Sequence, residues 1–153
     1  MKRRKLINNL FKTTIGAFLI SPSLLLPKII KAAINQPAFA AKEYTQTLKE
    51  LFGTEQVQDS SEVKMKVPEI AENGAMVPVT VISSLSGIES ISIIIEKNIR
   101  PLSAHYHLGK GMKPFIITRV KMRQSSNVHA VVKIGDQLFK ATSKVTVTVG
   151  GCN

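Results

Sequence analysis

Residues 144–149 read KVTVTV, and the chain ends directly behind them with Gly150-Gly151-Cys152-Asn153. Valine alternates with polar residues over this stretch, and an apolar side chain at every second position predicts a β-strand with one buried face. β-Branched side chains also favour extended backbone, because they restrict rotation about χ1. The last regular element is therefore predicted to be a strand, and the tail behind it carries the single cysteine of the sequence.

Similar runs occupy most of the preceding sequence, and turn signals such as Asn73-Gly74 and Gly135-Asp136 separate them. The predicted strands are 63–67, 77–82, 91–96, 115–122, 128–134, 137–142 and 144–149. About seven short strands with regularly spaced turns are typical of a β-sandwich. We therefore expect an all-β, immunoglobulin-like sandwich.

One helix is predicted in front of these strands. Tyr44, Leu48, Leu51 and Phe52 fall at i, i+4, i+7 and i+8, which places them on one face of a helix. Gly53 follows at the position where a helix commonly ends. The sequence thus predicts one folded domain over residues 41–149, with an N-terminal helix and a single core.

Residues 1–40 have the layout of an export signal. A basic cluster at 1–5 is followed by apolar runs, and Ala38 and Ala40 place small side chains where a signal peptidase reads the chain. Cleavage is expected after Ala40. Pro22, Pro27 and Lys28 interrupt the apolar residues, so a spanning helix is the weaker interpretation and no membrane span is expected after cleavage.

The pair Arg3-Arg4 resembles a twin-arginine motif, which directs already folded proteins across the membrane. An ordinary secretion signal with a long basic start is the alternative. Either route predicts an exported protein, and we expect it in the periplasm.

Removal of the signal changes the charge of the chain. The whole sequence carries 21 Lys and Arg against 10 Asp and Glu, a formal net charge of +11. Residues 1–40 hold seven of the positive residues and none of the acidic ones, which leaves a net charge of +4 on residues 41–153. Nucleic-acid binding thereby loses its main support, because neutralising phosphates needs clustered Lys and Arg.

Cys152 cannot form an internal disulfide, since it has no cysteine partner in the chain. Gly150 and Gly151 leave the backbone before it free in φ and ψ, so residues 150–153 are predicted to form a slender mobile arm. Four roles stay open for the thiol: an inert tail residue, a disulfide between two molecules, a metal ligand, or a reactive carrier thiol presented to other proteins.

The tail is similar to that of the SoxY family, the sulfur-carrier subunits of the bacterial thiosulfate-oxidising Sox system. Residues 70–81, an Asn-Gly turn leading into a Val-Pro-Val strand, and the helix at the start of the mature chain resemble the family as well. The family's usual end is Gly-Gly-Cys-Gly-Gly, whereas only Asn153 follows Cys152 here.

The resemblance implies a covalent carrier rather than an enzyme. A c-type cytochrome partner would join thiosulfate oxidatively to Cys152, a hydrolase would release sulfate, and a SoxZ-like β-sandwich subunit would form a heterodimer with the chain. Catalytic residues, metal ions and cofactors are not expected. The alternative is an exported β-sandwich binding module whose thiol is incidental or forms a dimer.

Two further sets of residues are candidates for a role. His105 and His107 would face the same way on a strand, and with His129 and Cys152 they would offer ligands to copper or zinc, although a loop or exposed strand is the simpler interpretation. The densest basic stretch comprises Lys110, Lys113, Arg119, Lys121 and Arg123. It predicts a solvated face or, alternatively, a docking surface for acidic partners.

Overall fold

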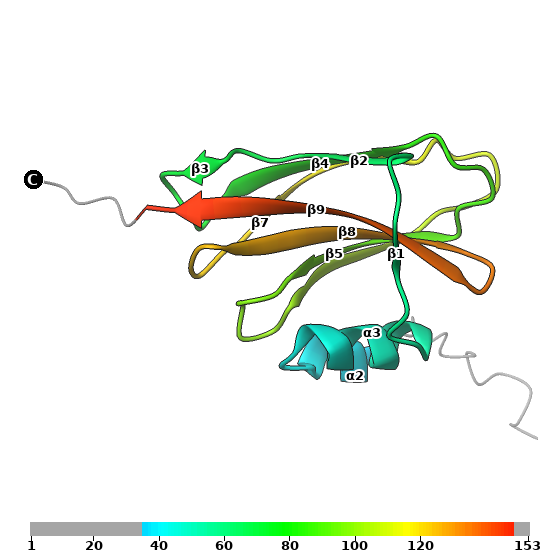
Figure 1. Ribbon diagram of the computed structural model, residues 1–153, viewed down its shortest axis with the longest axis horizontal. Coiled ribbons are helices and arrows are strands. Elements are labelled where there is room, and N and C mark those ends of the chain that lie inside the picture. The colour runs from blue at the N-terminus through cyan, green and yellow to red at the C-terminus, as the bar shows by residue number, and fades with distance from the viewer. Residues whose placement is uncertain (1–34, 149–153) are drawn as a thin grey trace, which may run out of the picture. The chain divides into compact units, whose positions relative to one another are not determined.

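The computed structural model describes residues 35–148 of the 153-residue chain, which form two helices followed by nine strands (Figure 1). The helices are α2 (Gln36–Ala40) and α3 (Tyr44–Phe52). The strands are β1 (Gln58–Asp59), β2 (Val63–Lys66), β3 (Ile70–Ala71), β4 (Val77–Ser83), β5 (Ser90–Ile95), β6 (Leu102–His107), β7 (Phe115–Val120), β8 (Ser126–Ile134) and β9 (Gln137–Val147).

The strands form two sheets. The larger has six strands in the order β1-β9-β8-β5-β6, and β3 also pairs with β9; the smaller has the order β2-β4-β7. Most pairs are antiparallel, whereas the short β1 and β3 run parallel to β9. The expected β-sandwich with an N-terminal helix is confirmed, and seven of its nine strands contain four or more residues.

The main core lies between the two sheets. Val77, Val79 and Val81 of β4 are fully buried and belong to the same cluster as Ile91 and Ile93 of β5. β5 is buried at every residue, because the sandwich core covers one of its faces and the helical segment covers the other. An unbroken apolar run such as 93–95 therefore suits a central strand with both faces covered.

The helices cover the outer face of the larger sheet (Figure 1). Leu48 of α3 is buried against a second cluster that includes Ile94, Leu102 and Val131. The predicted helix face is confirmed, and Gly53 ends α3 at φ 76°, a left-handed conformation that glycine adopts without strain.

One pair of predicted strands differs from the structure. The strands predicted at 137–142 and 144–149 are one continuous strand, β9, because Ser143 pairs with Val128 as an ordinary ladder residue. β1 is not among the predicted strands, and β6 is the strand that the sequence offered as one alternative for His105 and His107. These elements are polar in sequence, and their pairing with β9 and β5, respectively, extends their backbone.

α2 falls within the segment that the sequence assigns to the export signal. Asn35 caps this helix, since its side-chain oxygen accepts a hydrogen bond from the backbone N–H of Ala38, and Ala38 itself is fully buried. Removal of the signal after Ala40 remains a prediction. Within residues 35–148, no helix has the length and apolar character needed to span a membrane.

Truncation of a side chain between the sheets should lower stability. Ile93→Ala is expected to reduce the free energy of unfolding by about 2–5 kcal/mol, because it leaves a cavity in a fully buried site. Urea unfolding measures the change. Ile117→Ala is the matched control, since Ile117 is 69% exposed and its truncation should cost less than about 0.5 kcal/mol. Equal losses for the two variants would contradict this assignment of the core.

Candidate functional site

The residues predicted to form the carrier arm, Gly150, Gly151 and Cys152, lie outside the part of the chain that the structure describes. The structure does place the end of β9, and Thr148 is the last described residue. The candidate site is therefore built from the elements that hold this strand end.

Backbone hydrogen bonds hold the end of β9 on its β3 side. The N–H of Thr146 donates to the carbonyl oxygen of Glu69 at 2.8 Å, and the N–H of Thr148 donates to that of Ala71 at 3.1 Å. Buried backbone groups are rarely left unpaired, so β3 completes the hydrogen bonding of a strand that would otherwise have a bare edge here. The chain is thus anchored up to the residue before the tail.

The opposite side of the strand end is held by the connection between β7 and β8. The N–H of Val147 donates to Oγ of Ser125 at 2.9 Å. Gly74 is tightly packed nearby, since a Cβ added to it would lie 2.5 Å from the carbonyl oxygen of Met122 and 2.9 Å from Cγ1 of Val147. The predicted Asn73-Gly74 turn therefore needs glycine for close packing rather than for a positive φ.

The basic stretch divides between two places. Lys110 and Lys113 lie in the connection between β6 and β7. Arg119 is the last exposed residue of β7. Lys121 and Arg123 follow at every second position beyond the strand, and all three side chains are exposed. These three exposed side chains lead toward the end of the sandwich where β9 terminates.

His105 and His107 lie side by side on β6, as their spacing predicts. Their Nε2 atoms are 3.2 Å apart, and Nδ1 of His105 lies 2.8 Å from Oγ of the buried Ser92. Burial, with a smaller effect from His107, lowers the pKa of His105 to about 4. At neutral pH this imidazole is therefore uncharged.

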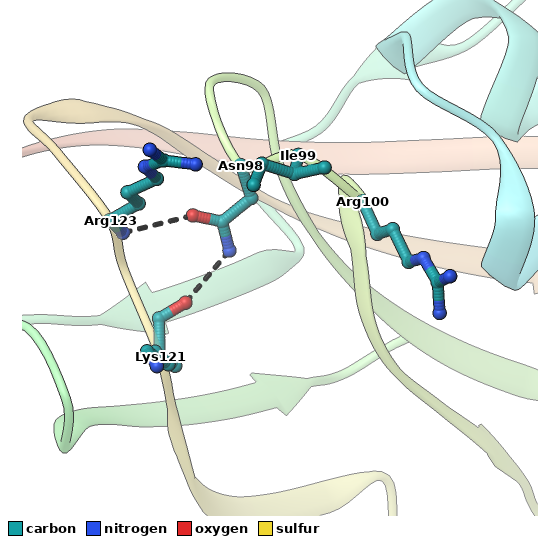
Figure 2. A pocket seen from close by; sticks show the side chains of 5 residues that line it. All are labelled: Asn98, Ile99, Arg100, Lys121 and Arg123. Atoms are coloured by element: carbon teal, nitrogen blue, oxygen red, sulfur yellow. Dashed lines mark hydrogen bonds between the residues drawn. The ribbon is translucent and has the colours of Figure 1, made fainter.

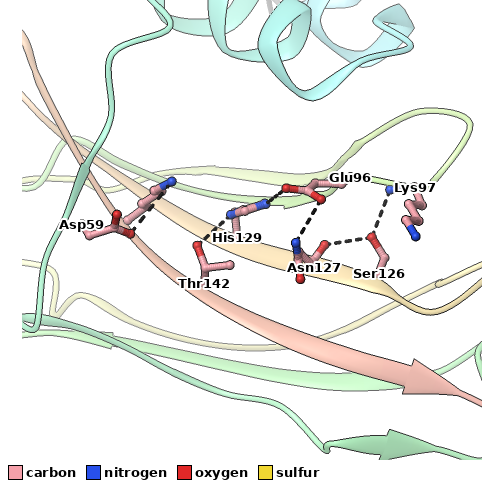
Figure 3. A network of polar contacts seen from close by, with 8 residues as sticks. Asp59, Glu96, Lys97, Ser126, Asn127, His129 and Thr142 are labelled. Carbon is pink, nitrogen blue, oxygen red and sulfur yellow. Dashed lines mark hydrogen bonds and ion pairs between the residues drawn. The ribbon is translucent and has the colours of Figure 1, made fainter.

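His129 occupies a different position in the sheet, on β8 beneath the helical segment (Figure 3). Its Nε2 lies 2.7 Å from Oε1 of Glu96, and its Nδ1 lies 2.9 Å from Oγ1 of Thr142. The ring of Tyr44 packs against the imidazole, with 4.5 Å between the two ring centroids. Burial lowers the pKa of His129, and the Glu96 carboxylate opposes this only in part. Both ring nitrogens are engaged, which is the arrangement of a structural histidine.

A metal site formed by the three histidines gains no support from these positions. Among the described residues, no group of three or more His, Cys, Asp or Glu side chains is placed to hold a metal ion. Cys152, the fourth ligand in that interpretation, is outside the described range.

Comparison with known proteins decides the family. The family model described as "Sulfur oxidation protein SoxY" matches residues 48–152, a range that ends on Cys152. The chain belongs to the SoxY family. The solved structure of the sulfur carrier protein SoxY from Chlorobium limicola f thiosulfatophilum is similar to it, with 38% sequence identity and a TM-score of 0.64. That match covers 72% of this chain and 96% of the Chlorobium chain. Among curated proteins, none matches the sequence.

Membership of the SoxY family supports a role in sulfur oxidation as a carrier protein. The immunoglobulin-like fold predicted from the strand pattern agrees with the Chlorobium SoxY structure. The sequence did not predict the contacts around the end of β9. Ala71 of β3, Gly74 of the connection behind it and Ser125 of the connection before β8 meet there, and the signal for Gly74 was limited to its Asn-Gly turn.

A methyl group at Gly74 should disturb the anchor of β9. Gly74→Ala is expected to cost about 1–3 kcal/mol of unfolding free energy, because the new Cβ must displace backbone at Met122. Gly109→Ala is the control, since its nearest neighbour would be Sδ of Met112 at 3.5 Å, an ordinary contact. Urea unfolding compares the two variants, and equal stability would show that Gly74 is not tightly packed.

The uncharged state of His105 can be measured directly. Imidazole proton shifts followed by NMR should give His105 a pKa near 4, and His107→Gln should raise it by removing a neighbouring positive charge. Because the unfolded chain protonates this histidine near pH 6.5, its contribution to stability is complete above that pH and is lost as the pH falls toward 4. A His105 pKa at 6.5 or above would contradict its burial.

Proposed function

We propose that this SoxY-family chain is an exported periplasmic carrier that holds sulfur intermediates covalently on Cys152. The observation that carries the proposal is the family match, which extends to Cys152 at the end of the aligned range. The hydrogen-bonded end of β9 supports it further, because a tethered thiol needs a fixed base.

The chemistry follows from the reactivity of a thiolate. Joining Cys152 to thiosulfate forms one sulfur–sulfur bond and releases two electrons, so that RS⁻ and S₂O₃²⁻ give RS–S–SO₃⁻. A c-type cytochrome partner would accept those electrons. A hydrolase would then use water to cleave the sulfonate, giving sulfate, two protons and the persulfide RS–S⁻. The intermediate stays on the carrier through both steps.

In this proposal the β-sandwich itself is not catalytic. Its part is to hold the arm and to bind other proteins, including a SoxZ-like subunit with which it forms a heterodimer. The outer face of the smaller sheet exposes Ile82, Phe115 and Ile117, and a partner subunit would cover apolar side chains of this kind.

Mass spectrometry of the C-terminal peptide tests the carrier role. Protein purified from cells oxidising thiosulfate should carry sulfur or thiosulfate adducts on Cys152 that a reducing agent removes. Cys152→Ser should lack every adduct and should abolish thiosulfate oxidation while its unfolding curve stays unchanged. A wild-type peptide found only unmodified or as a disulfide dimer would favour the alternative, a binding module with an incidental or dimer-forming thiol.

Export makes a separate prediction. The intact mass of the exported protein should correspond to a chain that begins at Ala41, and Arg3→Lys with Arg4→Lys should strongly reduce export by the twin-arginine route. Cleavage there would remove α2 and the buried Ala38 from the cluster under the helices. A mature protein that begins before Asn35 would contradict the assigned cleavage site and would keep α2.

A further inference from the structure

Two clefts involve the connection from β5 to β6 (residues 96–101) and the one from β7 to β8 (residues 121–125), and the second cleft also includes residues of β8 and β9. The first has a volume of about 500 Å³ and is lined by Asn98, Ile99, Arg100, Lys121 and Arg123 (Figure 2). The second has a volume of about 370 Å³ and is lined by Lys97, Ser125, Ser126, Asn127 and Lys144. Five cationic side chains therefore line the pair.

Hydrogen bonds between the two connections fix the backbone that carries these cations. Nδ2 of Asn98 donates to the carbonyl oxygen of Lys121 at 2.7 Å, and the N–H of Arg123 donates to Oδ1 of Asn98 at 3.1 Å (Figure 2). Nε2 of Gln124 donates to the carbonyl oxygen of Lys97 at 3.2 Å. These bonds hold the backbone of the two connections together, so binding an anion needs little rearrangement of the backbone.

Glu96, the acidic residue nearest in sequence to these cations, lines neither cleft. Glu96 lies in the same connection, but its two oxygens are engaged with Nε2 of His129 at 2.7 Å and Nδ2 of Asn127 at 3.1 Å (Figure 3). Within residues 35–148, neither set of lining residues includes Asp or Glu. Cations gathered in a concave site produce a local field that attracts small anions.

The clefts lie beside the strand end that leads to Cys152. Lys144 of β9 pairs with Asn127, and the N–H of Val147 bonds to Ser125, so lining residues of the second cleft contact β9 directly. Three residues separate Thr148 from Cys152, and the four steps between their Cα atoms span at most about 14 Å. A group attached to that thiol therefore cannot move far from this positive end.

We propose that the two cationic clefts form a binding site for sulfur oxoanions, namely the terminal sulfonate of a thiosulfate joined to Cys152 or free sulfate. The inference rests on the carrier function proposed above. Guanidinium groups match such ligands, because their fixed N–H donors can bind two oxygens of one tetrahedral anion. The site holds the charged end of the intermediate near the sandwich.

Sulfate titration of full-length, isotope-labelled Cys152→Ser protein tests the site without covalent chemistry. NMR amide shifts at residues 97–101 and 121–127 should change saturably with sodium sulfate, compared with sodium chloride at equal ionic strength. Arg100→Gln with Arg123→Gln should weaken binding about tenfold or more, because it removes charge-assisted hydrogen bonds. Lys64→Gln with Lys66→Gln removes the same charge from β2, away from the clefts, and should leave the affinity unchanged.

Equal shifts with chloride and sulfate would overturn the proposal, as would an equal loss of affinity in the two double variants. A surface that serves only to attract acidic proteins would give no saturable sulfate binding, which also overturns it. Because Cys152→Ser has no thiol, this titration is independent of the adduct experiment, and the two proposals can fail separately.

Wild-type protein loaded at Cys152 distinguishes the two sources of the anion. Tetrathionate reacts with the thiolate to give RS–S–SO₃⁻ and release thiosulfate, with atoms and charge balanced. If the tethered sulfonate is the ligand, the same amides shift without added sulfate, and added sulfate binds more weakly. If free sulfate is the ligand, its affinity is the same before and after loading. Either result supports the site, and loading that moves none of these amides excludes the tethered group.

Discussion

β9 is hydrogen-bonded along both of its edges, and the rest of the structure depends on that pairing. β8 pairs with it from Gln137 to Val145 on one side, while β1 and β3 pair with it at two separate points on the other. The segment between the helices and β4 is thereby tied to the larger sheet. Because β2 follows β1 in the chain, the pairing of β1 with β9 also fixes the point at which the chain enters the smaller sheet.

The proposed carrier divides its roles between the folded β-sandwich and the C-terminal tail. The sandwich buries two apolar clusters, one between the sheets and one under the helices, and these supply a stable base. Chemistry would be left to a thiol that enters the active sites of other proteins. Such a carrier needs a firmly held strand end more than it needs a pocket with acidic and basic groups. Ser125 and Ala71 hold the end of β9 by accepting hydrogen bonds from Val147 and Thr148.

The polar network around His129 serves a structural need of this arrangement. A histidine under the helical segment would be costly to bury without partners, and Glu96 and Thr142 supply them. The Glu96 carboxylate also accepts a hydrogen bond from Nδ2 of Asn127, so it lies between two residues of β8 (Figure 3). One carboxylate therefore joins β8 to the connection between β5 and β6.

The sequence by itself determined the sandwich, the helix at 44–52 with its end at Gly53, most strand positions and the Gly-Gly-Cys tail, because local periodicity and turn residues encode these features. It did not determine that 137–147 is one strand. The polar residues 142–144 predict an interruption, whereas their pairing with β8 keeps the backbone extended. Only the tertiary structure placed Arg100 and Arg123 on one cleft, and Lys97 and Lys144 on another. These residues are far apart in the chain, and their proximity depends on strand pairing over long sequence separations, which no local pattern records.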